Sequence, residues 1–189
     1  MTTIKGFFFD LDGTLVDTHE ANYLAYSHAI KSITSIDSDE RLKLLIKSGE
    51  NSNSFLTKLI PNIDEETVIM INAKKKEVYK DFLHVSELNE YLSVFLSQMY
   101  NHYTTALVTT AKKQNALAVL GQHDLEKYFS FMIFGEDVKN MKPHPDAYKL
   151  AIKQSGLSKD EVVAFEDSEK GIKSAETAGI KVIHIRNFL

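Results

Sequence analysis

Short apolar runs alternate with helix-like patterns along most of this chain. A continuous apolar run of a few residues is typical of a strand buried on both faces of a parallel sheet. The predicted strands are Ile4–Phe9, a run that ends at Thr109, Phe131–Phe134, a run that starts at Val162, and Ile180–Ile185. With helices between them, they predict an α/β fold built on a doubly wound parallel sheet with right-handed crossovers.

The stretch from residue 15 to residue 83 lacks strand patterns and is helical in character. Asp17 and Glu20 form a capping arrangement, and a stripe at helical spacing follows them: Ala21, Leu24, Ala25, His28 and Ala29. Further helices are predicted at Arg41–Lys47, Ser54–Leu59 and Glu65 to about Phe82, with a polar, flexible loop at Ser48–Ser54. The pattern predicts a small helical domain, 15–83, inserted into an α/β domain made of 1–14 and 84–189.

The helices of the α/β domain are predicted from periodicity and from their end signals. They are Glu87–Tyr100, Gln114–Leu120, Pro145–Ser155 and a helix that runs to Gly179. Gly156 is a stop signal for the third of these helices, and Ser158 with Glu161 forms a capping box before the next strand. This alternation of strands and helices supports the α/β prediction.

Asp10 and Asp12 directly follow the first predicted strand, and Gly13 follows them. Chemistry in parallel sheets collects at the carboxyl ends of strands, and side chains two residues apart on a strand point the same way. Gly13 allows a sharp turn close to a ligand. The arrangement suits a divalent metal together with an anion. Taken alone, it is equally consistent with an Asp-Gly turn whose carboxylates are solvated.

Three later segments favour metal-bound phosphate chemistry over that alternative. Thr109 and Thr110 end a strand and offer a hydroxyl and backbone N–H groups to phosphoryl oxygens, although such threonines are commonly turn formers or helix caps. Lys142 precedes the stiff turn Pro143-His144-Pro145 and can act as a fixed positive charge; a solvated lysine is the alternative.

Glu166 and Asp167 end the strand that starts at Val162. Carboxylate oxygens are the ligands that Mg²⁺ prefers, and Mg²⁺ is commonly bound by one or two of them with water and substrate phosphate. Asp167 can also serve as a helix cap. Two histidines are set aside: His28 is expected to be an interior residue of its helix, and His144 is expected to point to the surface, away from Lys142.

The composition of the chain limits the kinds of molecule that it is expected to bind. The chain has 189 residues, a net charge of −4 and no cysteine. The only cationic run, Lys74–Lys76, is interpreted as a solvated helix face, so neither nucleic acid nor an anionic membrane is an expected partner. The absence of cysteine excludes disulfides, thiol catalysis and zinc–thiolate sites, and the first apolar run is too short for a signal peptide or a membrane span. A cytoplasmic protein is expected.

The chain resembles the haloacid dehalogenase superfamily, whose four motifs correspond in order to Asp10-x-Asp12, Thr109, Lys142 and Glu166-Asp167. Within the superfamily it most resembles the phosphoglycolate phosphatase and β-phosphoglucomutase branch. The resemblance covers about 1–14 and 84–189. It implies a Rossmann-like core, a small inserted helical cap, Mg²⁺ as cofactor and a small phosphorylated metabolite as substrate. It also implies a cap loop that helps to choose the substrate, for which Asn22, Glu50, Asn51 and Asn53 are the candidates here.

The resemblance also implies a role for each motif residue. Asp10 is the nucleophile that forms an aspartyl-phosphate, and Asp12 is the general acid and base. Thr109, the Thr110 amide and Lys142 hold the transferring oxygens. The implied metal ligands come from Asp10, Asp12, Glu166 and Asp167. Asp12 contributes its backbone carbonyl, and Glu166 binds either directly or through water.

Two alternatives to a phosphatase stay open at this point. A phosphomutase of the β-phosphoglucomutase type carries a histidine in the first cap helix and an arginine in the cap loop, where this chain has Asn22 and Ser52. These differences favour hydrolysis. A catalytically silent phosphate-binding module is the second alternative, and the complete set of motif acids argues against it.

Overall fold

The computed structural model describes residues 3–48 and 50–186 of the chain. The chain folds into two compact units. One unit, called the core unit below, contains the chain up to Asp17 and from Glu87 onward, and the other, the helical unit, is Thr18–Ser86. The assignment of the helical unit as a cap remains a proposal.

The core unit is built on a five-stranded parallel sheet. Strand β1 (Gly6–Phe9) is central, with β4 (Thr104–Val108) on one side and β6 (Val162–Glu166) on the other. The outer strands are β5 (Phe131–Ile133) beside β4 and β7 (Lys181–His184) beside β6. The strand order β5-β4-β1-β6-β7 with parallel pairing confirms the predicted α/β class.

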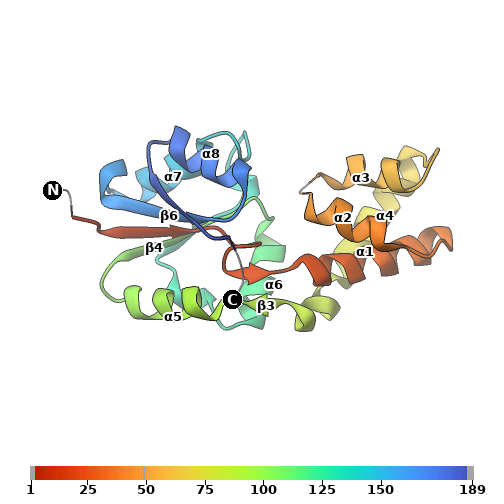
Figure 1. The fold of residues 1–189 in the computed structure, drawn as a ribbon, viewed down its shortest axis with the longest axis horizontal. Coiled ribbons are helices and arrows are strands. Elements are labelled where there is room, and N and C mark those ends of the chain that lie inside the picture. The colour runs from red at the N-terminus through yellow and green to blue at the C-terminus, as the bar shows by residue number, and fades with distance from the viewer. Residues whose placement is uncertain (1–2, 49, 187–189) are drawn as a thin grey trace. The chain divides into compact units, whose positions relative to one another are not determined.

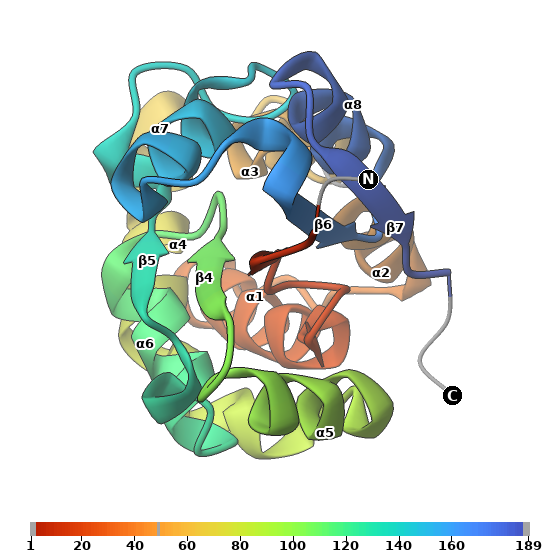
Figure 2. The same cartoon turned by 90° about the vertical axis from the view of Figure 1, so that its left-hand side faces the viewer.

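Helices cover both faces of this sheet (Figures 1 and 2). Helices α7 (Asp146–Ser155) and α8 (Glu169–Thr177) lie on one face, and α5 (Glu90–Met99) and α6 (Lys113–Gln122) lie on the other. Phe8 points to the first face and is fully buried there among small residues of β4 and β6. Short 3₁₀ turns occur at 126–128, 135–137 and 159–161.

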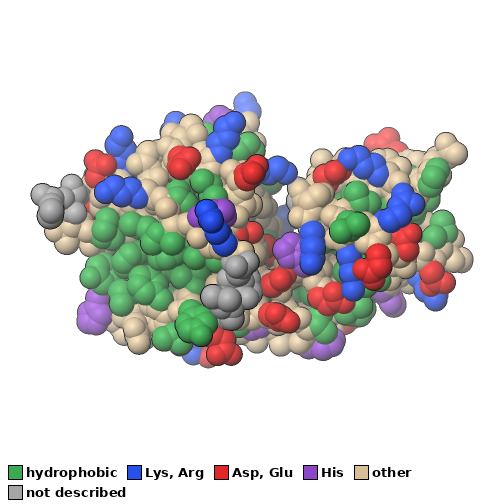
Figure 3. Space-filling view, in the orientation of Figure 1, with side chains coloured by type: hydrophobic (Ala, Val, Ile, Leu, Met, Phe, Trp, Pro, Cys, Tyr) green, Lys and Arg blue, Asp and Glu red, His purple; other side chains and the backbone are tan. Residues whose placement is uncertain are grey.

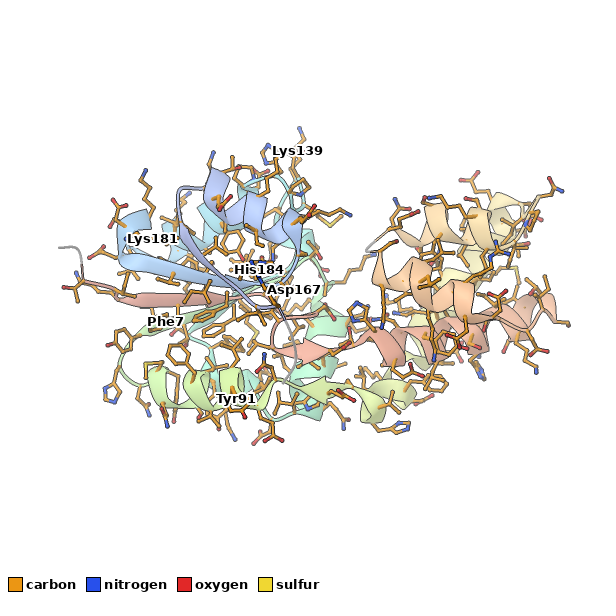
Figure 4. The ribbon with its side chains drawn as sticks, viewed as in Figure 1. Phe7, Tyr91, Lys139, Asp167, Lys181 and His184 are labelled. Carbon is orange, nitrogen blue, oxygen red and sulfur yellow. The ribbon has the colours of Figure 1, made fainter. Side chains whose placement is uncertain are left out.

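Aromatic side chains dominate the second face. The Phe7 ring lies 5.1 Å from the rings of both Phe95 and Tyr103. Figure 3 shows hydrophobic side chains gathered on the visible surface of the core unit, and Figure 4 labels Phe7 and Tyr91 there. Ile183 on β7, beside Phe165 of β6, is 47% exposed, so the covering of this face by α5 is incomplete.

A small antiparallel ribbon joins the two segments of the core unit that flank the helical unit in the sequence. Strand β2 (Val16–Asp17) pairs with β3 (Glu87–Leu88). The predicted helix Glu87–Tyr100 was therefore wrong at its start, because Glu87 and Leu88 pair as a strand and Asn89 caps the helix by accepting the Leu92 N–H. The stop at Gly156, which has a φ of 69°, and the capping box of Ser158 with Glu161 are both confirmed.

The helical unit contains four α-helices among its described residues. They are α1 (His19–Thr34), α2 (Glu40–Lys47), α3 (Ser52–Leu59) and α4 (Glu65–Val78), and a 3₁₀ helix at 79–85 follows α4. They enclose their own apolar core, with Ala29, Ile30, Leu42, Leu56 and Ile71 fully buried. No helix in the described parts of either unit has the length and apolar character needed to cross a membrane.

Three sequence predictions about the ends of these helices were wrong. The first helix is not capped by Asp17, which belongs to β2; it begins at His19. The α-helical part of the fourth helix ends at Val78 and continues as 3₁₀ turns through the predicted end at Phe82. Residues 52–54 of the predicted polar loop form the first turn of α3, because Asn51 caps it, and Gly49 of that loop lies outside the described residues.

Two side chains of the helical unit also differ from their predictions. His28 is exposed, because the buried stripe of α1 follows Ala21, Ala25 and Ala29 and leaves the histidine at its edge. Lys75, in the run interpreted as solvated, is only 8% exposed. Its ammonium lies 3.7 Å from the centre of the Tyr79 ring, so the favourable interaction of a cation with an aromatic face contributes to its burial.

Candidate active site

Asp10 lies at the carboxyl end of the central strand, where the sheet topology brings the ends of β4 and β6 beside it. Its backbone N–H donates to the Phe165 carbonyl at 3.0 Å, so the residue is still held in the sheet although β1 has ended. The chain then turns at Gly13, whose φ of 85° favours glycine. A Cβ at Gly13 would also lie 2.8 Å from Cγ of Asp167, so the close approach of the turn to this carboxylate requires glycine.

The ammonium of Lys142 joins three strand ends. Nζ donates to Oδ1 of Asp10 at 2.6 Å, to Oε1 of Glu166 at 2.6 Å and to the Val108 carbonyl at 2.7 Å. The lysine side chain is only 4% exposed. An ammonium has three N–H donors, and each finds an acceptor here. Lys142 is therefore a fixed positive charge between two carboxylates, and not the solvated lysine that the sequence left open.

Glu166 is completely buried. Its Oε1 accepts from Lys142 and also from the Tyr148 hydroxyl, which lies 2.5 Å away. Its Oε2 has no hydrogen-bond partner among the described residues. Gly171 on α8 makes room for this carboxylate, since a Cβ at that position would overlap it.

Asp167 follows Glu166 and completes an acidic cluster. The Thr14 hydroxyl donates to Oδ1 of Asp167 at 3.0 Å, and Nε2 of His184 lies 3.0 Å from the Asp167 carbonyl oxygen (Figure 4). Asp10, Glu166 and Asp167 each offer a carboxylate oxygen, and these oxygens lie within 4.8 Å of one another. The site thus concentrates negative charge around one ammonium.

The electrostatics of the cluster follow from burial and crowding. Burial, reinforced by the charge of Asp10, raises the pKa of Glu166 to about 8 and also raises the pKa of Asp167 from its ordinary value. Burial alone would lower the pKa of Lys142, but the carboxylates of Asp10 and Glu166 outweigh it and raise that pKa. Burial and the neighbouring acids raise the pKa of Tyr148, so its hydroxyl remains a donor at neutral pH.

The donor set fits a magnesium ion. Its ligand atoms are all oxygen, they are close together, and the buried Oε2 of Glu166 has no partner among the described residues. A divalent cation would relieve the repulsion that raises the pKa of Glu166 and of Asp167.

Magnesium is expected to stabilise the protein more at pH 8 than at pH 5.5. At Glu166 and Asp167 the folded protein holds more protons than the unfolded chain above about pH 4, so without metal the contribution of these two groups to stability falls as the pH rises. A bound Mg²⁺ would compete with those protons and would restore that loss of stability. Thermal melts at both pH values, with KCl of equal ionic strength as the control, measure this effect. An equal magnesium shift at both pH values would contradict it.

The other predicted core residues lie close to this centre, with contacts of their own. Asp12 is half-buried and forms an isolated bridge with Val16 in the turn. Thr109 is buried beside Val108, and its hydroxyl accepts the Ala111 N–H at 3.0 Å, while Thr110 is exposed. His144 is on the surface, as expected, with Nδ1 2.9 Å from Asp146.

The predicted substrate-binding residues of the helical unit fall into two groups. Asn22 and Glu50 line a pocket of about 230 Å³, together with Tyr26, Ile46, Ser52 and Phe55. Asn51 instead caps α3 by accepting the Ser54 N–H at 2.9 Å, and Asn53 accepts from the Asn72 amide at 3.2 Å. Glu50 also pairs with Lys58 at 2.7 Å. The structure brings together only the first group.

Sequence reasoning missed Thr14, Tyr148 and the Val108 carbonyl as members of the site. A signal existed for Tyr148, because it falls on the apolar face of its helix beside Ala147 and Ala151. A buried tyrosine hydroxyl needs a hydrogen-bond partner, so a polar group had to lie opposite it. Nothing in the sequence pattern distinguishes the Val108 carbonyl from those of its neighbours.

The fold is a parallel α/β fold with an acidic cluster and a buried lysine at the carboxyl edge of its sheet, and comparison with known proteins identifies its family. The model of the haloacid dehalogenase-like hydrolases matches residues 7–185, and the chain belongs to this family. The chain is 31% identical to a phosphorylated carbohydrates phosphatase of Thermotoga maritima, over 93% of this chain and 82% of the relative. It is 26% identical to a phosphoglycolate phosphatase of Photorhabdus laumondii, over 93% and 77%.

A solved structure agrees with this assignment. The crystal structure of a putative β-phosphoglucomutase from Thermotoga maritima is 29% identical, with a TM-score of 0.75 over 97% of this chain and 88% of that one. The family assignment made from the four motifs is therefore confirmed, and the protein is an enzyme of the phosphatase type.

Proposed function

We propose that this enzyme hydrolyses a small phosphomonoester with Mg²⁺ as cofactor, through a phosphorylated Asp10. One observation carries the proposal: a buried ammonium, Lys142, is bonded to the strand-end carboxylates of Asp10 and Glu166, and Asp167 lies beside them. Positive and negative groups fixed at the carboxyl edge of a parallel sheet suit a transferring phosphoryl group better than any neutral substrate. The phosphatase names of the relatives support the same reaction class.

The proposed metal ligands are Asp10, the Asp12 carbonyl, Asp167, and Glu166 directly or through water. When bound, Mg²⁺ supplies neutralisation of the negative charge on the phosphoryl oxygens. Lys142 supplies a second positive charge for the same oxygens, and Thr109 and the Thr110 amide are proposed to hold them. Most of the catalysis then comes from charges fixed in advance.

The proposed chemistry runs through two side chains. The Asp10 carboxylate attacks phosphorus, the bond from phosphorus to the ester oxygen breaks, and the leaving alkoxide takes a proton from Asp12. Asp12 then accepts a proton from water as that water attacks the phosphorylated Asp10, which releases phosphate and restores both carboxyl groups. Dividing the reaction in this way replaces one difficult displacement by two easier ones.

Asp12→Asn is expected to slow turnover by about 10²- to 10⁴-fold, because a positioned acid–base group contributes that much. The amide can neither protonate the leaving group nor accept a proton from water. Rapid-quench measurement should show both phosphorylation of the enzyme and its hydrolysis slowed. If only one of the two steps slowed, the double role of Asp12 would be wrong.

The substrate is proposed to be a small phosphorylated metabolite that the helical unit helps to select. Asn22 and Glu50 share one pocket there, and Asn22 and Ser52 stand where a phosphomutase carries histidine and arginine. Neither side chain is charged, which favours hydrolysis over transfer between sugar hydroxyls. A panel of sugar phosphates, phosphoglycolate, nucleotides and pyrophosphate, assayed for phosphate release, tests both points. A silent binding module would release none, and a mutase would produce an isomeric phosphate.

Alanine substitution of Asn22 or Glu50 is expected to lower kcat/KM for the best substrate about tenfold, while p-nitrophenyl phosphate changes much less. A lost hydrogen bond to a buried substrate group costs about 1–3 kcal/mol because its partner is left unpaired. Asn51 requires a different design, since Asn51→Ala also removes a helix cap worth about 1 kcal/mol. Asn51→Asp keeps the cap and changes only the amide. Equal changes on both substrates would rule out selection by these residues.

A further inference from the structure

Tyr148 is the one hydroxyl that reaches the acidic cluster from α7 in the described part of the core unit. The residue is fully buried in the apolar layer between α7 and the sheet, among side chains that are mostly small and hydrophobic. Its hydroxyl lies 2.5 Å from Oε1 of Glu166. A phenol that donates to a carboxyl oxygen in a buried place satisfies two polar groups at once, and removing one of them leaves the other unpaired at a cost in free energy. The contact is therefore more than the filling of space by an aromatic ring.

Tyr148 and Lys142 hold the same carboxylate oxygen. Nζ of Lys142 lies 2.6 Å from Oε1 of Glu166 and 5.2 Å from the centre of the Tyr148 ring. The second oxygen, Oε2, has no hydrogen-bond partner among the described residues. The orientation of the Glu166 carboxylate thus depends on two donors at one oxygen, and Tyr148 is the one of the two that does not also bind Asp10.

We propose that Tyr148 is a positioning residue of the active site, whose hydroxyl fixes the Glu166 carboxylate and thereby the place of the Lys142 ammonium and the cation-binding oxygens. The inference rests on the proposed magnesium site. Without the hydroxyl, Glu166 keeps a single donor and gains freedom to turn, so Lys142 and the acidic cluster lose part of their preorganisation. Partners of metal-site residues contribute in this way, and their loss typically weakens metal binding or activity 10- to 100-fold.

Tyr148→Phe tests the proposal because phenylalanine fills the same space without the hydroxyl. The affinity of the substrate-free enzyme for MgCl₂ is measured by isothermal titration calorimetry, and a thermal melt establishes that each variant is folded. Tyr103→Phe is the matched control, since its ring packs against Phe7 on the other face of the sheet. We expect magnesium affinity to fall about tenfold or more in Tyr148→Phe and to be unchanged in Tyr103→Phe.

A double-mutant cycle separates action through Glu166 from a general loss of packing. Magnesium affinity is measured for Glu166→Gln with and without Tyr148→Phe. If Tyr148 acts through the carboxylate, removing its hydroxyl changes affinity much less in the Glu166→Gln background. Wild-type affinity in Tyr148→Phe, or an equal loss in both backgrounds, would overturn the inference while leaving the magnesium site intact. A wild-type enzyme that binds no magnesium would instead overturn the proposed function, and this inference with it.

Discussion

Asp10→Asn is expected to reduce turnover on the order of 10⁴-fold or more, because removal of a nucleophile leaves only binding and fixed charges to act. The fold should persist. Asparagine has nearly the same shape as aspartate, and its amide oxygen can still accept from Lys142, which lies 2.6 Å from Oδ1 of Asp10. The loss of one negative charge from the cluster also relieves the repulsion that raises the pKa of Glu166 and of Asp167.

Steady-state phosphate release and chemical denaturation together test this prediction. The free energy of unfolding should stay within about 1 kcal/mol of the wild-type value while activity is lost. Asp160→Asn, at an exposed position of the core unit, is the matched control and should retain full activity. Substantial turnover by Asp10→Asn would show that the reaction does not pass through this carboxylate.

Lys142→Met is expected to lower the free energy of unfolding by about 3 kcal/mol at pH 8 and to abolish activity on every phosphomonoester. Breaking a buried ion pair by removing one partner leaves an uncompensated charge, and such changes cost about 3–5 kcal/mol. Here Asp10 and Glu166 would face one another without the ammonium that bonds to both.

The pH dependence of that loss has a definite sign. Burial and Asp10 already raise the pKa of Glu166, and the loss of Lys142, which lowers that pKa, raises it further. Because the pKa of wild-type Glu166 is already raised to about 8, the further rise in the variant acts above that pH, and the destabilisation relative to wild type should grow between pH 8 and about pH 9.5. Urea melts at both pH values measure it, with the exposed Lys149→Met on α7 as control. A destabilisation that shrank over this interval would contradict the assignment of Lys142 as a group that lowers the pKa of Glu166.

The sheet and its strand ends could be predicted from sequence because apolar runs determine them locally. The runs before Asp10, Thr109 and Glu166 pair in the structure as β1, β4 and β6, and parallel pairing alone places their ends at one edge. The Lys-Pro-His-Pro segment predicted a held lysine, and the sheet topology accounts for the acids that Lys142 meets. These parts of the site follow from residue type and chain order.

Other features could not be predicted because they depend on packing between segments. Tyr148 looks like an ordinary core residue until the strand carrying Glu166 lies opposite it. Lys75 reads as a solvated charge, and only the folding of the helical unit places its ammonium over the Tyr79 ring. Asn51 reads equally as a loop residue and as a helix cap, because the start of α3 depends on contacts beyond its own sequence. A side chain with a polar end and an apolar body can be buried or solvated, and only its neighbours in the fold decide which.

The central claim is that this enzyme uses a divalent metal to hydrolyse phosphomonoesters, and one assay tests it most directly. Phosphate release is followed from the best substrate of the panel in excess MgCl₂, then after addition of EDTA, and again after MgCl₂ is restored above the chelator. The acidic cluster and its unpartnered Glu166 oxygen predict turnover with magnesium, its loss on chelation and its recovery on readdition. Undiminished turnover in EDTA, or no phosphate release from any phosphomonoester with magnesium present, would contradict the claim.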